Sequence, residues 1–83
     1  MNLSTDHRRA LALLAEASRG VPEIVLVDGY GFAVDTVAAL IRAGYARADV
    51  EAVRAGGKRI EGDKRIEVVR VTITDAGRRA MAN

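Results

Sequence analysis

Lysine and arginine residues gather in the second half of the chain, around a duplicated tetrapeptide. Lys58-Arg59-Ile60-Glu61 recurs as Lys64-Arg65-Ile66-Glu67, with Gly62-Asp63 between the copies and Arg54 shortly before them. Residues 46–70 hold seven Lys or Arg residues against five acidic ones. Such cations bind nucleic-acid phosphates when several lie on one protruding element. The residues expected to contact phosphate here are Arg54, Lys58, Arg59, Lys64 and Arg65.

Catalytic and cofactor-binding patterns are not supported by the residue spacing. Gly56-Gly57-Lys58 lacks the first glycine and the Ser or Thr of a P-loop. Gly29-Tyr30-Gly31 lacks the third glycine of a dinucleotide fingerprint. His7 is the only histidine and there is no cysteine to join it as a metal ligand. We therefore expect no enzymatic activity, no cofactor and no metal site.

Length and composition indicate one small domain spanning residues 1–83, with a core built from aliphatic side chains. Hydrophobic residues make up 49% of the 83 residues, but only three are aromatic. So small a core gains from burying a further apolar face between two copies, which predicts a homodimer. No apolar run is long enough to span a membrane and no signal peptide opens the chain, so we expect a cytoplasmic protein without a membrane partner.

The first half of the chain predicts three helices. The Ala- and Leu-rich run 7–18 follows three residues that can each cap a helix, Ser4, Thr5 and Asp6. Residues 24–27, Ile-Val-Leu-Val, suit either a buried strand or a short helix over 22–28, for which Pro22 would be a suitable start. Residues 28–31 predict a turn before a third helix over 32–43. That helix has an apolar stripe (Ala33, Val37, Leu40 and Ile41) and a stop at Gly44.

Residues 46–74 predict a β-hairpin with two competing registers. Gly56-Gly57 could turn the chain early and set Arg54 opposite Arg59. A turn at Gly62-Asp63 instead pairs Glu61 with Lys64 and Lys58 with Glu67, which are favourable cross-strand charge pairs. We expect the second register, with one apolar face formed by Val50, Ala52, Val69, Val71 and Ile73. Thr74 then caps a last helix from Asp75 to about Ala82.

Two phrases in this order of elements carry a family resemblance. Leu40-Ile41-Arg42-Ala43-Gly44-Tyr45 ends a helix at a glycine, and Ile73-Thr74-Asp75-Ala76-Gly77-Arg78-Arg79-Ala80 leads from a strand into a helix. Together they resemble the winged helix-turn-helix regulators of the MarR type, over about residues 10–80. The resemblance implies an α+β fold with three helices, a two-stranded wing hairpin and a short C-terminal helix. Its helix-turn-helix would span about 22–43, which requires a short helix over 22–28, and its wing would span about 46–74. Gly77 would allow the last helix to pack closely.

The resemblance also implies a function, namely binding of double-stranded DNA in transcription regulation. The helix over 32–43 would enter the major groove, where Asp35, Thr36 and Ala39 would face bases and Arg42 would assist. The wing cations named above would contact the phosphate backbone. Residues 20–45 nevertheless carry three acidic residues against Arg42 alone. The alternative is therefore a winged-helix module that binds a protein partner and no DNA.

Overall fold

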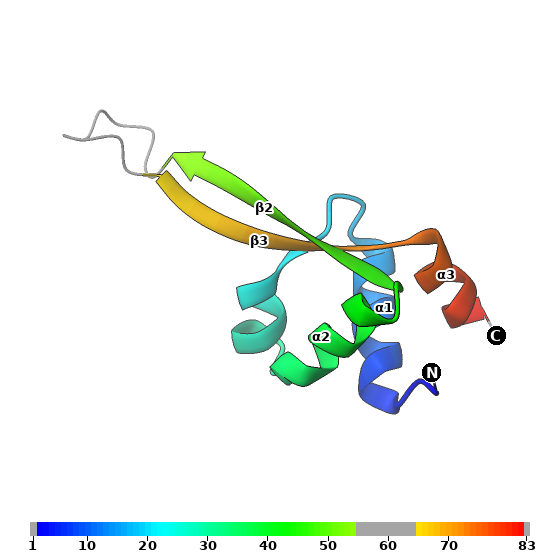
Figure 1. Cartoon of the computed structure of the whole chain (residues 1–83). Coiled ribbons are helices and arrows are strands. Elements are labelled where there is room, and N and C mark those ends of the chain that lie inside the picture. The colour runs from blue at the N-terminus through cyan, green and yellow to red at the C-terminus, as the bar shows by residue number, and fades with distance from the viewer. Residues whose placement is uncertain (1, 55–64, 83) are drawn as a thin grey trace.

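The structure is a computed structural model that describes residues 2–54 and 65–82, and these form a small α+β domain (Figure 1). The described residues contain four helices and a three-stranded antiparallel sheet in the order β1-β3-β2. The elements are α1 (Thr5–Glu16), β1 (Val21–Pro22), η1 (Val25–Gly29), α2 (Val34–Arg42), β2 (Ala46–Arg54), β3 (Arg65–Ile73) and α3 (Asp75–Ala82). The helices gather at the base of the sheet, while β2 and β3 extend away from them as a long hairpin (Figure 1).

The core lies where the helices meet the base of the sheet. Its fully buried side chains come from every layer, with Leu11 and Leu14 on α1, Leu26 on η1, Leu40 on α2 and Val71 on β3. Ala10, Phe32, Val37, Ala46 and Ile73 complete it, and none of the buried residues in the described part of the chain is polar. As predicted, aliphatic side chains supply nearly all of this core.

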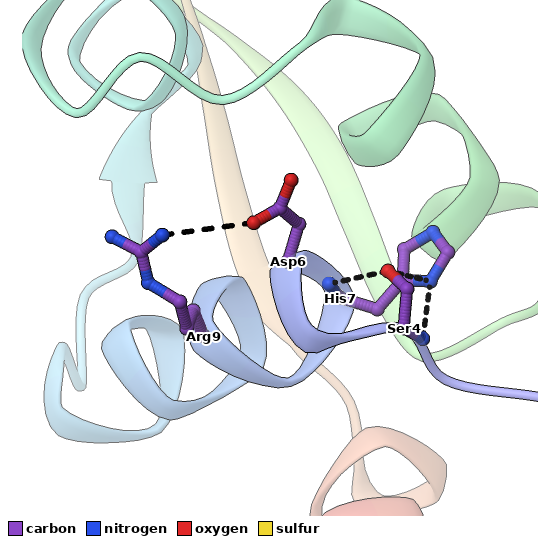
Figure 2. Close-up of polar contacts among 4 residues, drawn as sticks. All are labelled: Ser4, Asp6, His7 and Arg9. Carbon is purple, nitrogen blue, oxygen red and sulfur yellow. Dashed lines mark hydrogen bonds and ion pairs between the residues drawn. The ribbon is translucent and has the colours of Figure 1, made fainter.

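Helix α1 starts two residues earlier than predicted because Ser4 is its cap. The Ser4 hydroxyl oxygen accepts from the His7 N–H at 3.2 Å, and the His7 ring nitrogen Nδ1 accepts from the Ser4 N–H at 3.0 Å (Figure 2). This reciprocal pair satisfies two backbone donors that a helix start otherwise leaves unpaired. His7 therefore has a structural role at the start of the helix.

The segment before α2 was predicted correctly as helical, but its start was wrong. Val21 and Pro22 form the short strand β1, with Val21 opposite Val71 and Pro22 opposite Arg70 of β3. Pro22 has no N–H to donate, which an edge strand tolerates because it pairs on one side only, whereas a central strand would not. The helical turns follow from Glu23 and widen into the π-helix η1. A two-residue strand leaves no periodic pattern, so the sequence did not predict it.

Gly44 stops helix α2 as predicted, although the helix begins at Val34 and not at residue 32. Gly44 has φ +81°, its N–H donates to the Ile41 carbonyl at 3.0 Å, and the Tyr45 N–H donates to the Leu40 carbonyl at 3.0 Å. These two bonds form a Schellman stop, which favours glycine at the left-handed position. Phe32 lies in the core before the helix starts. Ala33 occupies the N-cap position of α2 and is exposed, so it does not belong to the apolar stripe in which it was predicted.

Helix α3 has the predicted bounds and is fixed through Thr74. The Thr74 hydroxyl accepts from the Gly77 N–H at 3.1 Å and donates to the Gly44 carbonyl at 2.6 Å. The Thr74 N–H donates to the Tyr45 carbonyl at 3.1 Å. Gly77 is buried, and a Cβ there would collide with the Tyr45 carbonyl oxygen, so the predicted close packing of this helix is confirmed.

The register of the hairpin was predicted wrongly. Val71 lies opposite Ala48 and Arg54 opposite Arg65, whereas the predicted pairing of Lys58 with Glu67 sets Val71 opposite Arg54. The early-turn alternative also differs, since it needs Arg54 opposite Arg59. The cause lies at the base of the hairpin, where the Thr74 hydroxyl donates to the Gly44 carbonyl and Gly77 packs against Tyr45; the predicted register would bring Thr74 beside Glu51 instead. The predicted tip at Gly62-Asp63 lies outside the described residues.

The apolar face of the hairpin was nevertheless predicted correctly. The observed register differs from the predicted one by six residues, and an even shift leaves every side chain on its original face. Val71 and Ile73 are buried at the base of this face, whereas Val50, farther out, is 64% exposed. The hairpin thus carries its apolar face beyond the area that the helices cover.

No helix in the described part of the chain is long and apolar enough to cross a membrane.

Replacing Ser4 by Ala removes one half of the α1 cap, and we expect the free energy of unfolding to fall by about 1 kcal/mol. Urea denaturation followed by circular dichroism measures it. Thr5→Ala, at the exposed residue next to the cap, serves as the control and should change stability by less than about 0.5 kcal/mol. Equal effects of the two substitutions would contradict the cap assignment.

Gly77→Ala and Gly29→Ala form a matched pair, because both glycines lie in helices. A Cβ at Gly77 collides with backbone atoms of Tyr45, whereas a Cβ at Gly29 meets only Val25 Cγ1 at 3.5 Å. We expect Gly77→Ala to destabilise the fold by about 1–3 kcal/mol and Gly29→Ala to be neutral or to stabilise it by up to about 1 kcal/mol. Thermal unfolding of both variants tests this, and a neutral Gly77→Ala would show that α3 is not held against Tyr45.

Candidate nucleic-acid interface

The two predicted contact residues of α2 lie on different sides of the helix. Thr36 is half-buried in the first turn, and Arg42 is exposed in the last turn. Six residues at about 100° each place the two side chains roughly 120° apart around the axis. Thr36 and Arg42 therefore do not share one contact surface.

The outward face of α2 instead presents Asp35 near its start and Arg42 near its end. These two exposed residues are seven positions apart, so they lie almost in line along the helix. Ala38 and Ala39, both partly exposed, lie between them. Asp35 lies in the first turn and Arg42 in the last turn, where the helix dipole stabilises a negative and a positive charge respectively. This face offers base edges one carboxylate, two methyl groups and one guanidinium, which is little for direct readout.

Two arginines at the base of the hairpin are already paired with carboxylates. Arg70 Nε lies 2.9 Å from Glu51 Oε2 across the two strands, and Arg47 Nε lies 3.2 Å from Asp49 Oδ2 along β2. Both pairs lie on the face opposite the apolar one. These two ion pairs offset the positive charge of Arg47 and Arg70 at the base of the hairpin.

Two of the predicted phosphate contacts are brought together at the outer end of the described strands. Arg54 is the last described residue of β2 and Arg65 the first of β3, and the ladder places them directly opposite each other. The remaining predicted wing contacts, Lys58, Arg59 and Lys64, lie outside the described residues. The observed register therefore sets Arg54 opposite Arg65, a pairing that neither predicted register contained.

A second group of cations lies on the helices away from the hairpin. Arg8 on α1 and Arg78 and Arg79 on α3 are exposed, and no described acidic side chain pairs with them. Arg9 differs, because it lies 3.6 Å from Asp6 (Figure 2) and 5.7 Å from the centre of the Phe32 ring. This arginine links α1 to the segment that precedes α2.

The sequence did not predict the exposed apolar side chains. Ile24, Val25, Tyr30 and Val34 are more than one-third exposed, as is Val50 on the hairpin. The signal was the run 24–27, because four consecutive apolar residues cannot all face the core from one helix. Only Leu26 of that run is buried. Tyr30 and Phe32, two residues apart in the sequence, separate into an exposed and a buried ring whose centres are 6.4 Å apart.

Among residues 2–54 and 65–82, no group of three or more His, Cys, Asp or Glu side chains is placed to hold a metal ion.

Comparison of the chain with protein-family models, with curated proteins and with solved structures found no match.

Proposed function

We propose that this chain is a DNA-binding winged-helix protein of the MarR type that acts in transcription regulation and contacts DNA mainly through its hairpin. The observation that carries this proposal is the placement of Arg54 opposite Arg65 at the outer end of the strands. In the proposal, these two arginines, together with Lys58, Arg59 and Lys64, hold the phosphate backbone. Thr36 and Arg42 of α2 make secondary contacts.

The arrangement of elements supports this reading of the fold. A helical pair, η1 and α2, precedes an antiparallel hairpin whose second strand continues into α3. A third short strand, β1, pairs with β3 on the side away from β2. This α+β arrangement is compatible with a winged helix in which β2 and β3 form the wing and α2 the helix next to it.

The charge distribution along the hairpin also supports phosphate binding at its outer end. Like charges directly opposite each other on two strands repel and destabilise the pairing, by about 0.2–1 kcal/mol. A phosphate between two arginines offsets that repulsion and accepts hydrogen bonds from both guanidinium groups. Nearer the base, Arg70 and Arg47 already have carboxylate partners. We propose that an anion binds where Arg54 lies opposite Arg65.

The composition of α2 implies that sequence-specific readout contributes little. Its outward face holds Asp35 and Arg42 as its only charged groups, and a carboxylate repels nearby phosphates. Affinity would come mainly from backbone contacts, which do not depend on base sequence. We therefore expect weak preference among DNA sequences.

A salt series on binding to random duplex DNA tests the proposal, with fluorescence anisotropy as the readout. If five cations contact phosphates, the affinity should fall roughly 500-fold between about 50 and about 200 mM salt. Arg54→Ala with Arg65→Ala should reduce the slope of log affinity against log salt by about 2. The matched control removes the same charge from α3, as Arg78→Ala with Arg79→Ala, and should leave that slope unchanged.

Two results would overturn the proposal. One is the absence of DNA binding at low salt by a folded protein. The other is an equal loss of slope in the hairpin and α3 variants, because net charge rather than the hairpin would then control binding. The first result favours the alternative, a winged-helix module that binds a protein partner without DNA. The exposed apolar side chains between Ile24 and Val34 support that alternative.

We also propose that the protein is a homodimer, because its core is small and Val50 on the apolar hairpin face is 64% exposed. Sedimentation equilibrium should give twice the chain mass of 8.9 kDa. A Val50→Ser variant should shift the mass toward the monomer if this face is part of the contact. A monomer at all concentrations tested would contradict the proposal.

A further inference from the structure

The exposed apolar side chains are concentrated in one short part of the chain. Of the five large hydrophobic residues exposed in the described regions, four lie between residues 24 and 34. Their exposed fractions are 65% for Ile24, 38% for Val25, 55% for Tyr30 and 62% for Val34. Concentrated apolar exposure of this kind is typical of surfaces that bind another molecule. We name residues 23–35 the acidic apolar segment.

The fold explains why these side chains face water. The segment is held to the body by β1 at its start and by the buried residues Leu26 and Phe32. The Tyr30 N–H donates to the Val25 carbonyl at 2.9 Å, which closes the wide turn of η1. Because Leu26 takes the inward position of this turn, Ile24 and Val25 lie outside it. Short π-helical turns of this kind are frequent at functional sites.

The charges of the acidic apolar segment all have one sign. Glu23, Asp28 and Asp35 are exposed, and none forms an ion pair with another described residue. No Lys or Arg occurs between Gly20 and Ile41. The segment thus combines apolar side chains with unneutralised carboxylates, the reverse of a surface that binds nucleic acid.

We propose that the acidic apolar segment binds a basic amphipathic helix of a protein partner. Such a helix offers Leu- or Ile-like side chains on one face for Ile24, Val25, Tyr30 and Val34, and Lys or Arg beside them for the three carboxylates. Charge complementarity of this kind favours the correct partner and accelerates encounter. The inference does not rest on DNA binding, because the segment and the outer hairpin are separate surfaces.

Two other occupants fit the segment less well. DNA is disfavoured because the carboxylates of Glu23, Asp28 and Asp35 repel phosphate. A second copy in a symmetric contact would bring the same three carboxylates toward their own equivalents. Only a partner of opposite charge turns these groups from a cost into an attraction.

The test titrates the isotopically labelled full chain with a synthetic helical peptide that carries Leu on one face and Lys on the other. NMR chemical shifts report where the peptide binds. A second peptide with Glu in place of every Lys is the control. We expect shift changes concentrated in residues 23–35 with the Lys peptide, weaker at higher salt, and no saturable change with the Glu peptide.

Matched variants separate the apolar from the electrostatic contribution. Ile24→Ser with Val34→Ser should weaken binding of the Lys peptide by at least about tenfold, whereas Val50→Ser, an equally exposed residue on the hairpin, should not change it. Glu23→Gln with Asp28→Asn should also weaken binding. Glu67→Gln, at an exposed acid on β3, should have little effect.

Several results would overturn the inference. These are no binding of the Lys peptide, equal binding of the Glu peptide, shift changes centred on the hairpin, or equal effects of the segment variants and their controls. Concentration-dependent shifts in residues 23–35 without peptide would instead identify a second copy as the occupant. Because no DNA is present, the outcome is independent of whether the hairpin binds DNA.

Discussion

Thr74 joins the start of α3 to the corner between α2 and β2, which lies 30 residues earlier in the chain, and the position of the hairpin depends on its hydrogen bonds. Its hydroxyl accepts from the Gly77 N–H at the start of α3 and donates to the Gly44 carbonyl at the end of α2. Its backbone N–H donates to the Tyr45 carbonyl at the base of the hairpin. Gly44 and Gly77 make this approach possible, the first through its left-handed backbone and the second because it has no Cβ. The register of β2 and β3, and with it the pairing of Arg54 with Arg65, follows from this point.

The local features of the fold could be predicted from the sequence because local chemistry determines them. Ser4 as a helix cap, Gly44 as a helix stop and Thr74 as the start of α3 all depend on residues within one turn. Alternation along the strands likewise predicted which side chains share a face. The register could not be predicted in this way, because the six-residue repeat makes several pairings equally good locally and a tertiary contact at Thr74 decides among them.

The candidate sites likewise combine features that the sequence predicts with features that only the tertiary structure determines. The cationic character of the hairpin follows from composition, but the pairing of Arg54 with Arg65 and the ion pairs of Arg47 and Arg70 depend on register. Strand β1 is too short to leave a pattern, and its pairing with β3 fixes where the next helical turns begin. That placement exposes Ile24 and Val25 while burying Leu26. The acidic character of this segment follows from the sequence, whereas the exposure of its apolar side chains is a consequence of tertiary structure.

We propose that the outer hairpin, with Arg54 opposite Arg65, and the acidic apolar segment bind different partners. The most direct test maps backbone amide shifts of the labelled chain during titration with a random DNA duplex. We expect the shift changes to increase along β2 and β3 toward Arg54 and Arg65, and residues 23–35 to change little. Shift changes centred on residues 23–35 and α2, with the strands unaffected, would contradict the proposal.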